Sequence, residues 1–596
     1  MLIGITSNTK NYVPVTNIYY AKKLFGVSVV NVNCRNAMIS DEYSDFIADY
    51  ELASDEVLSR NEICYIKIDQ IYTAVYIPKY LVPEKSLDAY GYKVFVRLFG
   101  LMDEQSIKAS GVKRLRNFPG MNLRGRGVLI GIIDTGIDYT HKAFINKDGT
   151  TKIASIWDQT IQNENLQQGI YYGTEYTREQ INSALLSNDP RSIVPSNDEI
   201  GHGTFLAGIA AGNEDLNNDF TGVAPDAELI VVKLKPAKSI IRDFFMVSHE
   251  LNCYQENDIM LGVKYLIETA AKYKRPLSIC IGLGTSEGSH DATDALSAYL
   301  SSVGQMEGVA VSIAAGNEGN SRHHYERNML IGTNLDTIDL NVGPDESGLY
   351  FEIWGDVPNN FGVELTSPGG EAVPIIVPRL NERREIDFIF EKTKINVYFQ
   401  LVGSRSGAQL VIMRLRNPTE GIWRIIIRKK DETLPLHLNI WLPINNFISE
   451  ETYFINSTPY TTLTSPANVD IPIVVTAYDS SNDSLYLKAS RGFTRTNRIA
   501  PSIAAPGVNI IGPANNNNYM RMTGTSVATA HTTGIAAMLL EWGVVNKALD
   551  HMDGTDIKNM LLRGAQREPG RIYPSPEWGF GILDIFGVFE DLRGNL

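Results

Sequence analysis

Four short motifs supply the residue types of a nucleophilic acyl-transfer site. They are DTG with Asp134, GHGT with His202, AAGNEG with Asn317 and GTSVATAH with Ser526. A serine hydroxyl is a poor nucleophile until a base takes its proton; His202 is the candidate base, and Asp134 would orient its ring. The Asn317 side-chain amide and the Ser526 backbone N–H would donate to the oxyanion formed on an attacked carbonyl. The motifs together predict a hydrolytic site built on Ser526.

Each of these residues also has a purely structural interpretation. Asp134 could be a turn aspartate, His202 a satisfied core histidine, and Ser526 the N-cap of an ordinary core helix. Asn317 could serve only a left-handed turn. Because the four motifs occur in the order Asp, His, Asn, Ser, each at a predicted strand end or helix start, we favour the joint catalytic interpretation.

The segments around the motifs alternate between buried strands and helices. Apolar runs before Asp134, at 222–234, at 277–284 and at 308–317 are typical of parallel strands buried on both faces. Helical patterns cover 178–186, 258–273 and 294–303, and a helix of small residues follows Ser526. We therefore expect an α/β fold with a doubly wound parallel sheet, whose strand carboxyl ends hold the site.

Three other regions differ from this α/β body. Residues 1–37 form an extension of uncertain structure, and residues 38–105 have the pattern of a small α+β module with a hairpin over 64–78. The polar stretch MDEQSIKASGV after Leu101 reads as an exposed joint. Residues 329–460 contain about eight short strand-like runs, which predicts a β-sandwich or jelly roll inserted in the body. The body itself would then comprise 106–328 and 461–596.

Composition excludes several classes of function. The chain has 596 residues and a net charge of 54 − 68 = −14, which argues against nucleic acid as a partner. No apolar run reaches the roughly 18 residues of a membrane helix, and the first residues lack the pattern of a secretory signal. The four cysteines are far apart without a CxxC pair, so we expect neither zinc nor a disulfide framework, and we expect Cys64 and Cys280 to be buried apolar residues.

The motifs resemble those of the subtilisin-like serine peptidase (subtilase) family. WDQTI, YYGTEYTREQINSAL and the inserted β segment also resemble the clostridial Csp branch, over about residues 40–590. The departures are small: Ala530 replaces a usual proline, and Val527 replaces a common methionine. IGLG resembles the family's S1-wall strand with Gly282 in place of serine, which assigns Gly282, Leu283 and Gly284 to substrate binding.

The resemblance implies a subtilisin-like fold and a serine endopeptidase made as a zymogen. Residues 38–105 would be a prodomain that acts as chaperone and bound inhibitor, with its tail, residues 93–105, across the active site. The insertion over 329–460 would be a jelly roll that braces the catalytic domain. We expect self-cleavage between Gln105 and Ser106, and a protein or peptide substrate. In the Csp branch that substrate is another zymogen, a spore hydrolase, so limited activating proteolysis and a spore-associated or exported location stay open.

Two alternatives remain. One is a catalytically occluded, pseudoprotease-like signalling or scaffold protein, against which the intact triad argues. The other makes the insertion a binding module, but we expect Trp354, Trp423 and Trp441 to lie in its core. The resemblance requires no cofactor; calcium is common in the family, yet no acidic loop matches, so no metal ligand is assigned. The resemblance also implies that His531 is a structural residue. We expect His141, His323 and His324 to lie in solvent or in loops.

Overall fold

The computed structural model describes residues 34–49, 62–83, 87, 90–102, 104–105, 123–163, 169–379, 382–403 and 406–593. The chain divides into two compact units, Met1–Val96 and Arg97–Leu596, which are described separately. Ser106 and most of the predicted joint and N-terminal extension lie outside the described residues.

The first unit contains a helix and a three-stranded antiparallel sheet. The helix is α1 (Cys34–Ile39), and the strands follow the order β1 (Tyr43–Asp49), β3 (Tyr72–Pro78) and β2 (Cys64–Lys67). The predicted hairpin is confirmed: β2 and β3 pair, and Asp69 Oδ1 accepts hydrogen bonds from the backbone N–H groups of Ile71 and Tyr72 in the turn. Phe46, Val75 and Val94 contribute to a small apolar core.

A disulfide joins Cys34 in α1 to Cys64 in β2. Cys64 is buried, as predicted, but the expectation that the cysteines form no disulfide was wrong for this pair. The two cysteines are 30 residues apart, and only the packing of α1 against β2 brings them together, which spacing alone does not reveal. Cys280 is a free buried cysteine, as predicted.

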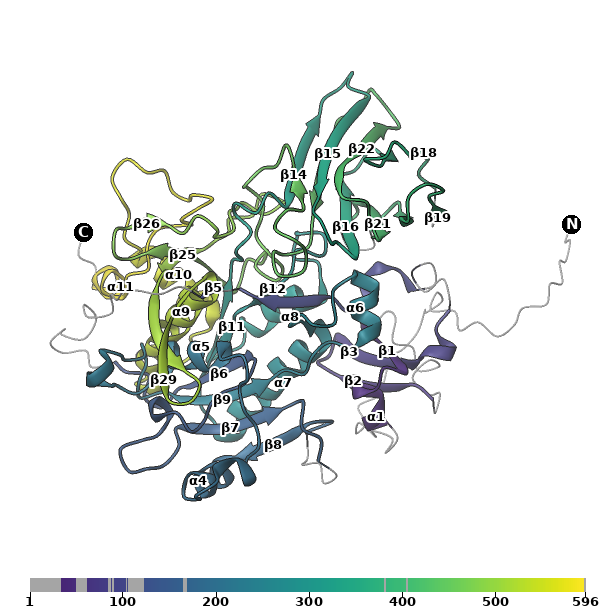
Figure 1. Ribbon diagram of the computed structural model, residues 1–596. Helices are drawn as coiled ribbons and strands as arrows, with labels where there is room; N and C mark the ends of the chain where they lie inside the picture. The colour runs from purple at the N-terminus through teal and green to yellow at the C-terminus, as the bar shows by residue number, and fades with distance from the viewer. Residues whose placement is uncertain are drawn as a thin grey trace, which may run out of the picture. The chain divides into compact units, whose positions relative to one another are not determined.

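The second unit is built on a nine-stranded, mainly parallel sheet (Figure 1). Its order is β26-β25-β13-β11-β6-β9-β7-β8, with β27 beside β25; β8 and β26 are the antiparallel members. The strands are β6 (Leu129–Asp134), β7 (Ile153–Asp158), β8 (Thr174–Thr177), β9 (Glu228–Lys233), β11 (Leu277–Ile281), β13 (Val309–Ala314), β25 (Ile473–Asp479), β26 (Ser484–Leu485) and β27 (Ile503–Pro506).

Helices cover both faces of this sheet, as the apolar runs predict. The helices are α4 (Arg178–Leu185), α5 (His202–Ala211), α6 (Ser239–Phe245), α7 (Glu256–Tyr273), α8 (Ala295–Val303), α9 (Thr525–Leu540), α10 (Gly554–Gly564) and α11 (Ile585–Leu592). In β6, Ile132 shares a core with α5 and α9, whereas its neighbour Ile133 faces Gly262 of α7. Successive strand residues point to opposite faces, so α7 lies across the sheet from α5 and α9.

The insertion consists of two antiparallel sheets. The six-stranded sheet has the order β14 (His324–Met329), β23 (Leu436–Trp441), β16 (Gly348–Gly355), β21 (Gln409–Arg416), β20 (Lys394–Gln400) and β19 (Arg383–Asp387). The five-stranded sheet has the order β18 (Ala372–Ile376), β17 (Phe361–Thr366), β22 (Gly421–Lys429), β15 (Leu335–Val342) and β24 (Tyr453–Phe454).

Both sheets of the insertion share one apolar core, which includes Phe351, Phe361 and Trp423. The eight predicted strand runs are all present, and the observed arrangement is a two-sheet sandwich (Figure 1, teal to green). Sequence reasoning missed β14, β19 and β24, because β14 and β19 are rich in charged residues and β24 has only two residues. The narrower assignment to a jelly roll stays a prediction.

A stack of three rings joins the insertion to the α/β body. Trp441 of β23 stacks on two histidine rings. The ring centroid of His290, in the loop before α8, is 3.9 Å from that of Trp441, and the ring centroid of His324 of β14 is 4.8 Å from it. Its indole N–H donates to the Thr461 carbonyl oxygen. Trp441 is buried, as are Trp354 and Trp423, which confirms that none of the three is exposed. The core shared by the two sheets includes Trp423, whereas Trp441 is buried against the body.

Of the three histidines expected in solvent or loops, His141 and His323 lie in loops, as expected, whereas His324 is the first residue of β14. His141, His323 and His324 are all buried. Each ring finds a polar partner: the Asn518 carbonyl oxygen lies 2.8 Å from His141 Nε2, a Glu318 oxygen 3.0 Å from His323 Nδ1, and the Tyr460 carbonyl oxygen 2.7 Å from His324 Nδ1. A hydrogen-bonded imidazole can be buried at modest cost, so its polarity is a poor guide to exposure.

His437 of β23 lies between two carboxylates. Its Nδ1 is 3.0 Å from Asp356 Oδ2 and its Nε2 is 2.8 Å from Glu326 Oε1. The hydrogen bonds to Asp356 and Glu326 raise the pKa of His437 to about 9. In the unfolded chain a histidine titrates near pH 6.5. The resulting stabilisation is therefore complete below about pH 6.5 and is lost as the pH rises through about 9.

We predict that His437→Gln lowers the stability of the protein at about pH 6 but not at about pH 10. The expected difference at the lower pH is about 1–2 kcal/mol after allowance for solvent screening. Urea unfolding followed by tryptophan fluorescence at both pH values measures it. His249→Gln, at an exposed histidine 3.0 Å from Asp243, is the matched control. An equal effect of His437→Gln at both pH values would contradict the prediction.

Candidate active site

Three of the predicted residues meet at the carboxyl end of β6. Asp134 is the last residue of β6, His202 the first of α5 and Ser526 the second of α9. His202 Nδ1 lies 2.7 Å from Asp134 Oδ1, and His202 Nε2 lies 3.1 Å from Ser526 Oγ. All three residues are at most 1% exposed. The structure thus forms a continuous hydrogen-bonded chain from a carboxylate through an imidazole to a hydroxyl.

Glycines allow the strand end and the helix start to approach this closely. A side chain at Gly203 would collide with the Gly136 carbonyl oxygen and come within 3.2 Å of Asp134 Cβ. Gly136 itself has a φ of +118°, which favours glycine. The Gly203 N–H donates to Thr135 Oγ1, and the Thr135 N–H donates to Asp134 Oδ1. The DTG and GHGT motifs therefore fold as one interlocked turn.

Asn317 is oriented by the residue before Ser526. The N–H and Oγ1 of Thr525 both donate to Asn317 Oδ1, at 3.2 Å and 3.1 Å. Because these two bonds hold the amide oxygen toward Thr525, the NH₂ group of the same amide points away from Thr525. Among the described residues the buried Nδ2 has no hydrogen-bond acceptor. A buried donor without an acceptor costs stability, and an oxyanion would satisfy it.

The predicted substrate-binding segment is paired with the chain's own residues. Leu283 and Gly284 form β12, which pairs antiparallel with β4 (Leu98–Leu101). On its other side β4 pairs with β10 (Tyr254–Gln255). A peptide in this position is held as the middle strand of a small sheet, so recognition there acts mainly through its backbone.

Met102 continues this strand to the nucleophile. Its N–H donates to the Gly282 carbonyl oxygen at 3.2 Å, and its own carbonyl oxygen accepts from the Ser526 N–H at 3.3 Å. Beyond it, β5 (Glu104–Gln105) pairs with β29 (Asn518–Thr523), which in turn pairs with β28 (Ile510–Ala514). The chain therefore contacts the site on both sides of Ser526, and the Met102 carbonyl oxygen accepts from the Ser526 N–H, one of the two expected oxyanion donors.

This register differs from the predicted one. We expected Gln105 and Ser106 at the nucleophile and an exposed joint after Leu101, but Met102 is buried and Gln105 pairs with Met522. The pairing of β4 with β12 sets which carbonyl reaches Ser526, and a register of this kind follows from strand contacts rather than from residue type. Sequence reasoning also missed Thr525 as a positioning residue, although the GTS motif contains it.

The other sequence predictions concern His531, metal binding and membrane-spanning helices. His531 lies inside α9, where burial lowers its pKa to about 4, and it is separate from the Asp134–His202–Ser526 chain. No group of three or more potential metal-binding side chains occurs among the described residues, and calcium stays unassigned. None of the helices in the described ranges is long and apolar enough to span a bilayer.

Comparison with known proteins finds a family and a solved structure that are similar to this chain. The profile described as the subtilase family, peptidase S8, matches residues 125–331 and 454–581, which omits most of the sandwich. The solved structure of the CspB protease of Clostridium perfringens superposes with a TM-score of 0.72 at 32% identity, covering 81% of this chain and 96% of that one.

Two curated relatives are more distant. The PII-type proteinase of Lacticaseibacillus paracasei is 23% identical over 478 residues, and a C5a peptidase of Streptococcus pyogenes is 21% identical over 509 residues. These alignments cover 70% and 80% of this chain but only 22% and 41% of the relatives, so the chain spans less than half their length. The family match over more than half of the chain, together with the CspB superposition, shows that this protein belongs to the subtilase family and has its subtilisin-like fold.

Proposed function

We propose that this subtilase is a serine endopeptidase with Asp134, His202 and Ser526 as its catalytic triad. The observation that carries the proposal is the buried hydrogen-bonded chain of 2.7 Å and 3.1 Å that ends on Ser526 Oγ. Its distances fall in the range expected for a nucleophile, its base and the group that orients the base.

The mechanism follows from the position of the Met102 carbonyl. Ser526 Oγ attacks a peptide carbonyl held there while His202 Nε2 takes the hydroxyl proton, and His202 then gives that proton to the leaving amine. Asp134 stabilises the imidazolium that forms between these steps. The Ser526 N–H and Asn317 Nδ2 donate to the oxyanion. Water, activated by His202, finally hydrolyses the acyl-enzyme.

The same geometry supports a self-processing zymogen. Residues 98–102 are bound as an extended peptide with one carbonyl at Ser526, which is the arrangement a substrate needs. We therefore place the scissile bond between Met102 and Asp103 instead of between Gln105 and Ser106. The residues before Asp103 would then form a prodomain whose last residues, 97–102, inhibit the cleft, and activation of another protein by limited proteolysis would follow their release.

An occluded scaffold protein is the second candidate function. The observation in its favour is that the chain's own segment fills the cleft and that the Met102 carbonyl already accepts the Ser526 N–H. Labelling of Ser526 by a fluorophosphonate separates the two functions, because the reagent needs both an activated serine and an open cleft. A protein that is neither labelled nor cleaved, even after limited proteolysis of its first unit, would be a scaffold.

We predict that the purified wild-type chain is converted to a fragment that begins at Asp103, whereas Ser526→Ala and His202→Ala keep the full mass. Removal of a triad member is expected to reduce turnover by about 10⁶-fold, since the nucleophile and base act as a unit. Intact-mass spectrometry and N-terminal sequencing measure the outcome. Ser484→Ala, at an exposed serine, should behave as wild type. A wild-type chain that stays at full mass would contradict self-processing.

We also predict that Asn317→Ala slows self-cleavage by about 100- to 1,000-fold through loss of one oxyanion donor. The time course of the Asp103 fragment gives the rate, and thermal unfolding shows whether the variant is folded. Asn482→Ala is the control, since Asn482 is exposed. If a folded Asn317→Ala chain cleaves itself at the wild-type rate, Asn317 is not an oxyanion donor.

A further inference from the structure

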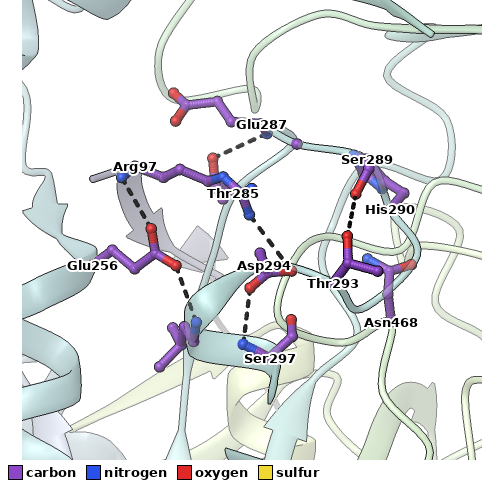
Figure 2. A network of polar contacts seen from close by, with 12 residues as sticks. Arg97, Glu256, Thr285, Glu287, Ser289, His290, Thr293, Asp294, Ser297 and Asn468 are labelled. Carbon is purple, nitrogen blue, oxygen red and sulfur yellow. Dashed lines mark hydrogen bonds and ion pairs between the residues drawn. The ribbon is translucent and has the colours of Figure 1, made fainter. Parts of the chain in front are cut away.

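The segment that fills the cleft begins with a buried arginine. Arg97 precedes β4 and is only 7% exposed. Figure 2 shows it against Glu256, at the start of α7, and against the loop that runs from Thr285 to Asp294 before α8. All of these contacts lie within the second unit.

Two glutamates hold the backbone of this segment. The Arg97 N–H donates to Glu256 Oε2 at 3.3 Å, and the Glu256 N–H donates back to the Arg97 carbonyl oxygen at 3.0 Å. The Leu98 N–H donates to Glu287 Oε2 at 3.1 Å. These bonds would hold any residue at position 97, so they do not by themselves select arginine.

The side chain of Arg97 has its own partners. Its Nη1 lies 3.5 Å from Asp294 Oδ2, and its guanidinium lies so close to Gly288 that a Cβ there would be 2.8 Å from Cζ. Asp294 is fixed because its Oδ1 caps α8 through the Ser297 N–H (Figure 2). Glu256 is fixed likewise, since its Oε1 accepts from the Leu296 N–H. Backbone N–H groups of the body therefore orient both carboxylates, and the absence of a side chain at Gly288 leaves room for the planar guanidinium.

The charges of the pocket complement this cation. Glu256, Glu287 and Asp294 are all buried and all belong to the α/β body, whereas the guanidinium belongs to the bound segment. Burial raises the pKa of Glu256 and of Glu287, and the charge of Arg97 acts in the opposite direction on both. A neutral residue at this position would leave the buried Asp294 carboxylate without the cation that it contacts, which is costly.

We infer that Glu256, Glu287, Gly288 and Asp294 form a subsite for an arginine side chain, and that this arginine sets the register of cleavage. The subsite takes the residue five positions before the one whose carbonyl faces Ser526. In the chain itself that residue is Arg97, and in a protein substrate it would be an arginine at the same spacing. The inference rests on the proposed peptidase function and adds a substrate preference to it.

Insertion of one glycine after Gly100 tests this register. If Arg97 stays in its pocket, residue Leu101 moves into the place of Met102, and the chain is cut after Leu101. If contacts nearer the nucleophile decide, the cut stays after Met102. Either register puts a glycine beside Ile444, where a Cβ at position 100 would collide, so that constraint does not bias the result. N-terminal sequencing of the fragment gives the answer.

Phe99 is also buried, and in the insertion variant it would keep its place together with Arg97. A second variant therefore distinguishes the effect of Arg97 on the cleavage position from that of Phe99. The glycine insertion combined with Arg97→Ala should restore the cut after Met102. A cut after Met102 in the simple insertion variant, or a cut after Leu101 in both variants, overturns the inference and leaves the peptidase intact. A wild-type chain that is never cut overturns self-processing and the register together, so the two failures are distinguishable.

If the variant with the inserted glycine is not cleaved, substitutions of Arg97 in the chain of normal length test the same inference. Arg97→Ala should slow self-cleavage about tenfold or more, the loss expected for a hydrogen-bonded charge, while Arg97→Lys, which keeps the charge, should remain closer to wild type. Equal rates for wild type and Arg97→Ala would overturn the inference. Thermal unfolding of each variant shows whether the chain is folded.

Discussion

The burial of Asp134 is the constraint from which the active site follows. An ionised carboxylate removed from water is costly unless charged or hydrogen-bonding partners surround it. Here the Thr135 N–H and the His202 ring supply those partners, so the end of β6 and the start of α5 must lie within hydrogen-bonding distance. Gly136 and Gly203 permit that approach. The position of His202 then fixes where Ser526, and hence the first turn of α9, has to be.

The residues that sequence reasoning identified are those whose geometry is local. DTG, GHGT and GTS each contain both a chemical group and the glycine or threonine that places it, so a short motif carries most of the information. The two-sheet insertion was predictable for a related reason, since alternating apolar residues mark each strand individually. The family match and the hydrogen-bonded chain agree with these predictions, whereas the boundaries between domains remain predictions.

The features that sequence reasoning missed depend on contacts between distant segments. The Cys34–Cys64 disulfide, the burial of His323 and His324 and the placement of Met102 at Ser526 each require knowledge of which strands or helices are neighbours. A strand can shift along its partner without any change in its sequence pattern, so neither LFGLM nor DEQS reveals which carbonyl meets the nucleophile. Nothing in the local sequence marks Arg97, because its carboxylate partners lie more than 150 positions away.

Glu352 gives the insertion a part in the cleft. This buried residue of β16 accepts hydrogen bonds from the Gly288 N–H and from the side chains of Tyr350 and Trp354. The loop that touches the bound chain is thus anchored partly by the body and partly by the sandwich. Loss of this glutamate from the sandwich would leave the Gly288 N–H without its acceptor, so the sandwich and this wall of the cleft are structurally coupled.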